Sequence, residues 1–256
     1  MSLLDNAPIP RKTMVLFFVV DTSGSMSGSK IGAVNSAIED IIPELQNLSE
    51  SNVDAQIKIA VLEFSSGAKW ITPNGPVEVE NIVWKDLDAD GATDFGAACI
   101  QLNDKLSVKT FMNYETYCFK PIIFLLMDGS PTDDYRRSLY LLKRNQWFQQ
   151  AIKVAVAIGD EADMPVLENF TGSSETVVTV HNSTSLKKFI KFEYLGGMRA
   201  YTCNDILKDE ITWHISEIER LVSELTQYKN EQDTINEWDN FTTGTASTDG
   251  TDVDEW

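Results

Sequence analysis

The sequence predicts an α/β protein with a doubly wound, mostly parallel sheet, one antiparallel edge strand and a C-terminal helix. Short apolar runs alternate with helical patterns from residue 14 to about residue 195, which is typical of parallel strands joined by crossover helices. The runs at 15–20 and 122–127 are continuously apolar, as expected for central strands covered on both faces. Only three residues separate the runs at 57–64 and 68–72, so these two form an antiparallel hairpin.

The strands follow from these runs in chain order. They are expected at 15–20, 57–64, 68–72, 122–127, 154–158 and 177–180. The hairpin places 68–72 at an edge of the sheet, antiparallel to its neighbour. Right-handed crossovers join the remaining strands, which makes the rest of the sheet parallel.

Helical patterns fill the connections between the strands. They are expected at 30–48, 94–106, 134–150, 164–170 and 183–194. Pro43 falls inside the first of these helices. Because proline lacks a backbone N–H and its ring crowds the preceding turn, we expect Pro43 to kink or break that helix.

The C-terminal part of the chain carries a different pattern. Gly196-Gly197 is interpreted as a hinge, and apolar residues then recur at spacings of three and four from Leu207 to Tyr228. This spacing predicts one long helix with a heptad stripe. Such a stripe either docks on its own domain or forms a coiled coil or partner-binding helix. We favour docking, because three heptads are near the lower limit for an independent coiled coil.

These patterns divide the chain into four segments. They are an N-terminal arm at 1–12, the α/β domain at 13–195, the C-terminal amphipathic helix at 196–229 and an acidic tail at 230–256. Beyond Lys229 the chain has acidic residues among Thr, Gly, Ser and Asn but no basic residue. This composition predicts disorder, because it offers little apolar surface to bury.

The charge balance excludes two classes of partner. The chain has 39 acidic and 21 basic residues, for a net charge of −18. Nucleic acids and anionic membranes would be repelled, whereas cations and basic protein surfaces would be attracted. No apolar run is long enough to cross a bilayer, and the N-terminus shows no apolar signal segment. Three cysteines without a C-x-x-C pair argue against a disulfide framework. We therefore expect a soluble cytoplasmic protein.

Oxygen-bearing side chains follow two of the predicted strands and open one predicted helix. Asp21, Ser23 and Ser25 alternate at the end of the first strand, Thr93 opens the helix at 94–106, and Asp128 follows the strand at 122–127. Ligands bind beyond the carboxyl ends of parallel strands, so these segments are expected to meet at one edge. Two carboxylates and three hydroxyls suit a small divalent cation, Mg²⁺ or Mn²⁺. With neutral hydroxyls nearest the cation, an open coordination position would attract a carboxylate from a partner.

The same residues carry a family resemblance. Asp-x-Ser-x-Ser at 21–25, Gly-Ala-Thr-Asp at 91–94 and Met-Asp-Gly at 127–129 resemble the metal-ion-dependent adhesion site of von Willebrand factor A domains. The resemblance implies that Ser23, Ser25 and Thr93 touch the metal, while Asp21 and Asp128 hold it through water. It covers roughly residues 12–195.

Longer phrases resemble one intracellular branch of that superfamily, the TerY-like proteins named for tellurium resistance. They occur at 20–28, 91–98 and 128–133. This second resemblance implies a role in tellurite or stress resistance, in systems that contain kinase-like and phosphatase-like proteins. It implies nothing about the segment after Gly196.

The sequence therefore predicts a non-enzymatic module that recognises an acidic group of a protein partner through a bound Mg²⁺ or Mn²⁺. Two alternatives stay open. One is a metal-dependent hydrolase or phosphatase, for which the nearby acids without a predicted role are Asp94, Asp133 and Asp134. A hydrolase would need one of these acids as a base that activates water. The other is a structural assembly subunit that acts through the C-terminal helix.

Overall fold

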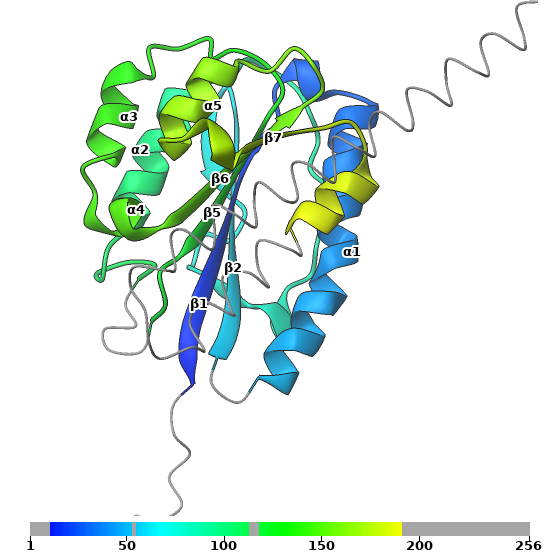
Figure 1. Ribbon diagram of the computed structural model, residues 1–256, viewed down its shortest axis with the longest axis vertical. Helices are drawn as coiled ribbons and strands as arrows, with labels where there is room; N and C mark the ends of the chain where they lie inside the picture. Colours follow the sequence, from blue (N-terminus) through cyan, green and yellow to red (C-terminus); the bar gives the residue numbers. More distant parts are fainter. Residues whose placement is uncertain (1–10, 53–54, 113–117, 191–256) are drawn as a thin grey trace, which may run out of the picture.

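The computed structural model describes residues 11–52, 55–112 and 118–190. Its seven strands form one sheet in the order β3-β2-β1-β5-β6-β7, and β4 also pairs with β2 (Figure 1). The strands are β1 (Lys12–Asp21), β2 (Ala55–Ser65), β3 (Gly67–Trp70), β4 (Val77–Glu78), β5 (Ile122–Met127), β6 (Ile152–Ile158) and β7 (Val177–Val180). From β2 to β7 all neighbours pair in parallel, whereas β3 and β4 run antiparallel to β2. The predicted fold class is confirmed.

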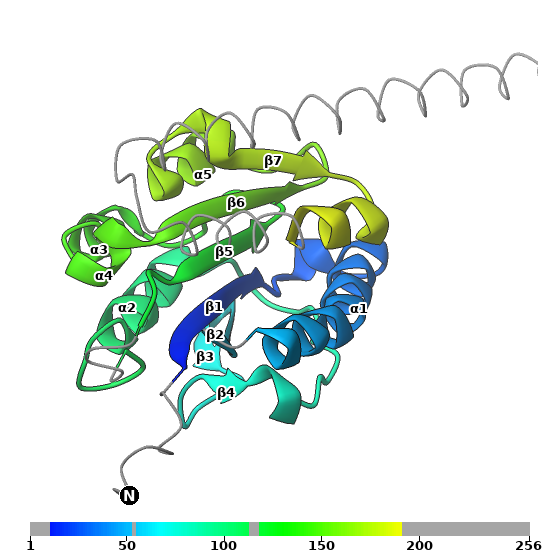
Figure 2. The same cartoon turned by 60° about the horizontal axis from the view of Figure 1, so that its bottom comes forward.

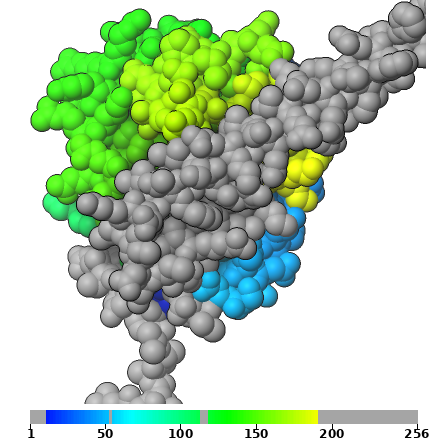
Figure 3. Space-filling model, viewed as in Figure 1, coloured from blue at the N-terminus to red at the C-terminus, as the bar shows by residue number. Residues whose placement is uncertain are grey.

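Helices cover both faces of the sheet (Figure 2). They are α1 (Ser29–Ser51), α2 (Phe95–Lys105), α3 (Arg136–Leu142), α4 (Gln146–Gln150), α5 (Met164–Thr171) and a helical stretch at 183–190. The helix α1 and the stretch 183–190 lie on one face, and α2 to α5 lie on the other. In Figure 3 the surfaces of α1, in blue, and of the α3 to α5 region, in green, accordingly lie on opposite sides of the molecule.

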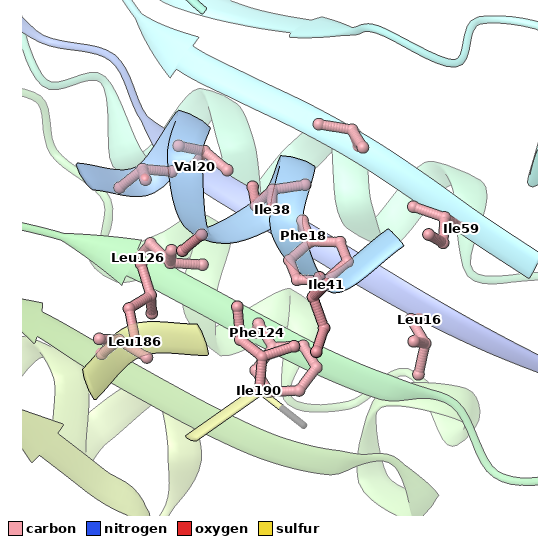
Figure 4. Close-up of a cluster of buried hydrophobic side chains, with 14 of the residues drawn as sticks. Leu16, Phe18, Val20, Ile38, Ile41, Ile59, Phe124, Leu126, Leu186 and Ile190 are labelled. Atoms are coloured by element: carbon pink, nitrogen blue, oxygen red, sulfur yellow. The ribbon is translucent and has the colours of Figure 1, made fainter. Parts of the chain in front are cut away.

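The strand β1 supplies both halves of the hydrophobic core, because successive side chains of a strand point to opposite faces. Leu16 and Phe18 pack in the cluster beneath α1, and Phe17 and Val19 pack in the cluster beneath α2 to α5. In the first cluster the rings of Phe18 and Phe124 stack with their centroids 5.3 Å apart (Figure 4). This two-sided packing explains the continuous apolar runs of the central strands.

The sequence predicts that Pro43 kinks or breaks its helix. The structure shows that it does not break the helix. The helix α1 runs without interruption from Ser29 to Ser51 with Pro43 inside it. Proline removes the hydrogen bond to the carbonyl four residues earlier, which belongs to Glu39. Both Pro43 and Glu39 are exposed, so water can satisfy that carbonyl and the buried face of α1 keeps its packing.

The predicted helix at 134–150 is two helices rather than one, and Asn145 separates them. Its side-chain oxygen accepts hydrogen bonds from the N–H groups of Trp147 and Phe148, at 2.9 and 3.3 Å, and so caps α4. Its amide nitrogen donates to the carbonyl oxygens of Asn103 and Leu106. The helical pattern of apolar residues is continuous over 134–150, and it gives no sign of a capping residue inside the segment. For this reason the sequence predicts one helix there.

Replacing Asn145 by Ala should therefore lower the free energy of unfolding by about 1–2 kcal/mol, the usual cost of losing a helix cap. Equilibrium denaturation in urea measures the change. The exposed Asn81, which hydrogen-bonds only to the side chain of Glu78, offers a control, and Asn81→Ala should change stability by less than about 0.5 kcal/mol. Equal losses in the two variants would contradict the capping role of Asn145.

Several predictions concern segments outside the described residues. They are the C-terminal helix with its heptad stripe, the acidic tail and most of the N-terminal arm, so these stay predictions.

No helix in the described ranges is both long and apolar enough to cross a membrane. The two cysteines that the structure describes, Cys99 and Cys118, are free thiols. Burial raises the pKa of Cys118 to about 11.

Candidate metal centre

The strand register brings the two predicted carboxylates to one edge of the sheet. Val20 of β1 lies opposite Leu126 of β5. Asp21 ends β1 and Asp128 follows the last residue of β5 directly. Both carboxylates consequently leave neighbouring central strands at their carboxyl ends, where parallel sheets bind ligands. Each is almost completely buried.

One oxygen of Asp21 is satisfied and the other is not. Its Oδ1 accepts a hydrogen bond of 2.8 Å from the backbone N–H of Ser23. Its Oδ2 is buried and has no hydrogen-bond partner. Burial raises the pKa of Asp21 from 3.8 to about 6, although the hydrogen bonds from Ser23 oppose this rise and the negative charge of Asp128 adds to it. A buried carboxylate with a free oxygen is a site that a cation would stabilise.

A chain of hydrogen bonds connects the loop after β1 with Asp128. The hydroxyls of Ser23 and Ser25 lie 3.0 Å apart, and the Ser25 hydroxyl donates to Oδ1 of Asp128 at 2.7 Å. Ser23 is buried, whereas Ser25 is exposed. The four predicted residues Asp21, Ser23, Ser25 and Asp128 thus form one cluster that reaches solvent at Ser25.

Thr93 lies beside this cluster on a loop that backbone hydrogen bonds hold in place. The N–H of Gly24 donates to the carbonyl of Gly91 at 3.0 Å, and the N–H of Asp90 donates to the carbonyl of Thr22 at 2.9 Å. On its other side, Thr93 exchanges two hydrogen bonds of 2.9 Å with Thr132. In the described part of the chain, no hydrogen bond joins the Thr93 hydroxyl to the other four side chains. The loop is therefore positioned at the same edge, with Thr93 almost fully buried.

Lys30 is a further member of the site that the sequence patterns do not predict. Its Nζ lies 2.6 Å from Oδ2 of Asp128, in the first turn of α1. The two residues are 98 positions apart in the chain. A local signal does exist, because a basic residue in the first turn of a helix lies at the unfavourable end of the helix dipole. That signal marks an unusual lysine but does not identify its partner.

Of the three acids that a hydrolase could use as a base, two accept hydrogen bonds from backbone N–H groups and the third is exposed. Asp94 accepts a hydrogen bond of 2.7 Å from the N–H of Gly67, in the turn between β2 and β3. Asp133 accepts hydrogen bonds from the N–H groups of Gly96 and Ala97, at 3.0 and 3.3 Å, and so caps α2. The third acid, Asp134, is exposed, with 82% of its side chain accessible. Asp133 therefore caps a helix that precedes it in the chain.

The donor set fits a hard divalent cation. The five predicted side chains offer only carboxylate and hydroxyl oxygens, which Mg²⁺ and Mn²⁺ prefer. The unpartnered Oδ2 of Asp21 supplies a buried negative group that lacks a counter-charge. Within residues 11–52, 55–112 and 118–190, no group of three or more His, Cys, Asp and Glu side chains is placed to hold a metal. Hydroxyl oxygens would therefore have to complete the site.

Solved structures share this fold at low sequence identity. A von Willebrand factor type A protein from Catenulispora acidiphila is 18% identical, with a TM-score of 0.54, over 73% of this chain and 43% of that one. The pilus adhesin SpaC from Lactobacillus rhamnosus GG is 14% identical, with a TM-score of 0.54, over 70% of this chain and 30% of that one.

A third similar structure holds a metal. It is proximal thread matrix protein 1 from the mussel byssus, described with a zinc-occupied MIDAS motif. It is 18% identical, with a TM-score of 0.50, over 71% of this chain and 44% of that one. The present chain thus covers less than half the length of each of these three proteins. In a comparison with curated proteins, no sequence matches this chain.

A family model identifies the domain directly. The model of the von Willebrand factor type A domain matches residues 16–192. This range includes every strand of the described sheet beyond the first residues of β1, and all five predicted site residues. The chain therefore belongs to the von Willebrand factor type A domain family.

Proposed function

We propose that this domain binds a protein partner through a Mg²⁺-type cation held by Asp21, Ser23, Ser25, Thr93 and Asp128. The observation that carries the proposal is the buried, unpartnered Oδ2 of Asp21 beside the hydrogen-bonded chain from Ser23 to Asp128. Von Willebrand factor A domains are mostly non-catalytic binding modules for protein ligands. Membership of this family supports the proposal.

The neutral and the charged residues of the proposed site have different roles. The neutral hydroxyls of Ser23, Ser25 and Thr93 would hold the cation directly, and Asp21 and Asp128 would hold it through water. When bound, such an ion supplies a Lewis-acidic position for an oxygen ligand. Ser25 is the exposed member of the cluster, so a carboxylate of the partner would approach from its side. An acidic residue of the partner is consequently the group that the site recognises.

A binding role accounts for the nearby acids better than a hydrolytic role does. A hydrolase needs a base within hydrogen-bond reach of the attacking water. Asp94 and Asp133 instead hold backbone N–H groups of neighbouring elements, and Asp134 points into solvent. This arrangement supports a non-enzymatic module. Incubation with phosphate esters in the presence of Mg²⁺ or Mn²⁺ tests the alternative, and we expect no turnover.

The cellular setting is proposed from the sequence phrases alone. The segments at 20–28, 91–98 and 128–133 support a place in the TerY-like branch, with a cytoplasmic role in tellurite or stress resistance. Kinase-like and phosphatase-like proteins are the partners that this branch implies. The net charge of −18 argues against nucleic acids and anionic membranes as partners.

The double variant Asp21→Ala/Asp128→Ala tests the metal site. Removal of both carboxylates should weaken Mn²⁺ binding at least tenfold, because each orients or neutralises the cation. Titration calorimetry measures the affinity, and circular dichroism verifies that the variant is folded. The variant Asp134→Ala removes an exposed acid of the same region and should bind Mn²⁺ like the wild type. Unchanged Mn²⁺ affinity in the double variant would refute the proposed site.

Partner binding is the second readout. Affinity capture from the native cell should recover a partner with the wild-type protein in Mg²⁺. The same partner should be lost in EDTA and with the double variant. A partner that is retained under both conditions would show that recognition does not use the metal site.

A further inference from the structure

Lys30 supplies a cation to the candidate metal centre from within the chain. Its Nζ lies 2.6 Å from Oδ2 of Asp128, whose side chain is fully buried, while 28% of the Lys30 side chain is accessible. Ser25 donates to the other oxygen of Asp128. Both oxygens of Asp128 are therefore engaged, in contrast to Asp21, whose Oδ2 has no partner.

The position of Lys30 is otherwise unfavourable. It lies in the first turn of α1, where the helix dipole is positive and disfavours a cation. That turn holds no acidic residue, and its N-cap, Gly28, offers no side-chain hydrogen bond. Asp128, on the loop after β5, is thus the group that stabilises the ammonium there. A lysine held by a candidate metal ligand would meet any divalent cation that approaches the same carboxylate.

We propose that Lys30 is a tethered competitor of the divalent cation: its ammonium occupies Asp128 in the metal-free domain and so lowers the affinity for metal. The inference rests on the proposed function, because it concerns the same site. Two carboxylates and one ammonium give the cluster a net charge of −1 instead of −2. A positive charge beside a carboxylate disfavours the binding of a second cation there, so the ammonium repels a metal cation that approaches Asp128.

A cleft beside Lys30 offers space for the ammonium when it is displaced from Asp128. Its stem passes Gly159, where an added Cβ would lie 3.6 Å from the Lys30 Cε. Beside it is a cleft of about 220 Å³ between α1 and the ends of β6 and β7. Ser29, His181 and Asn182 line this cleft together with Lys30. The ammonium can therefore leave Asp128 for polar surroundings when a metal binds.

Titration of Mn²⁺ into the variant Lys30→Met tests the proposal. Loss of the competing charge should tighten Mn²⁺ binding at least tenfold. The variant Lys187→Met is the control, because Lys187 is similarly accessible at 31% and pairs with Asp40 and Glu44 instead. It removes the same charge from the chain and should bind Mn²⁺ within twofold of the wild type.

A second variant separates charge from hydrogen bonding. Lys30→Gln keeps a donor for Asp128 but has no charge, so it should also bind Mn²⁺ more tightly than the wild type. It provides the test as well if Lys30→Met does not fold. In EDTA, both variants should unfold at a lower temperature than the wild type, because Asp128 loses its counter-charge, and saturating Mn²⁺ should remove this difference.

The outcomes separate the two claims. If the wild type binds Mn²⁺ and neither Lys30 variant binds it more tightly, Lys30 is not a competitor and the inference is wrong. Weaker binding in both variants would instead make Lys30 a residue that positions Asp128 for the metal. If neither the wild type nor any Lys30 variant takes up Mn²⁺, the proposed metal site itself fails, and the inference fails with it.

Discussion

The metal-free variant Asp21→Asn should be more stable than the wild type at pH 7.5, and this advantage should disappear near pH 4. Burial raises the pKa of Asp21 from 3.8 to about 6. The folded domain therefore takes up a proton at Asp21 between these two values, and the unfolded chain does not. The stabilisation from this proton is complete below about pH 4 and is lost as the pH rises through about 6.

The size of the effect follows from the shift. About two pKa units correspond to about 3 kcal/mol between the two limits of pH. An asparagine cannot ionise, yet its carbonyl oxygen can still accept the hydrogen bond that the N–H of Ser23 donates to Asp21. Its amide adds a buried donor, but that cost is the same at every pH. The difference in the free energy of unfolding between variant and wild type should thus change by about 3 kcal/mol from pH 4 to pH 7.5.

Urea denaturation in EDTA at several pH values measures this difference. Asp134→Asn is the control, because the exposed Asp134 lies in the same region of the domain and its replacement should leave the pH dependence unchanged. Saturating Mn²⁺ should stabilise the wild type at pH 7.5 and stabilise Asp21→Asn less. Parallel pH curves for the wild type and Asp21→Asn would contradict the assignment of a raised pKa to Asp21.

The central strands were predictable because their environment is uniform along their length. In β1, residues 14–20 are all apolar and buried, which is the pattern expected of a strand with two covered faces. The two-residue strand β4 has too few residues for any periodicity and was not predicted. Asn145 and Pro43 show the same limit for helices. Their effect depends on contacts and solvent exposure that the helical pattern does not contain.

The candidate site divides in the same way. The sequence placed Asp21, Ser23, Ser25 and Asp128 correctly at one edge, because strand ends and short spacing are local properties. Their role as metal ligands stays a prediction. Lys30 and Asp133 were not assigned their contacts, since Lys30 reaches Asp128 across 98 positions and Asp133 caps α2 across 37. Such pairings depend on how the loops pack over the sheet edge.

Gly96→Ala should cost the domain about 3 kcal/mol, because α2 and the loop after β5 meet at this glycine. A Cβ at Gly96 would lie 2.6 Å from Oδ2 of Asp133 and 2.9 Å from the backbone Cα of Tyr135. Overpacking of this kind typically costs about 1–3 kcal/mol. Displacement of Asp133 also weakens its hydrogen bond with the N–H of Gly96, and bonds to a charged group contribute about 1.5–3 kcal/mol.

Urea denaturation of Gly96→Ala against Gly32→Ala isolates this contact. Gly32 lies in α1 with nothing within 4 Å of an added Cβ, so alanine there should stabilise the domain by up to about 1 kcal/mol.

Combining Gly96→Ala with Asp133→Ala removes one of the two clashing groups, and the pair should then cost less than the sum of the single changes. Asp133 caps the start of α2, which lies directly after the loop at 91–94 that carries Thr93. If this loop contributes to the metal site, Gly96→Ala should also weaken Mn²⁺ binding. A variant Gly96→Ala as stable as Gly32→Ala would show that the loop yields freely, and that α2 does not hold the edge of the site in place.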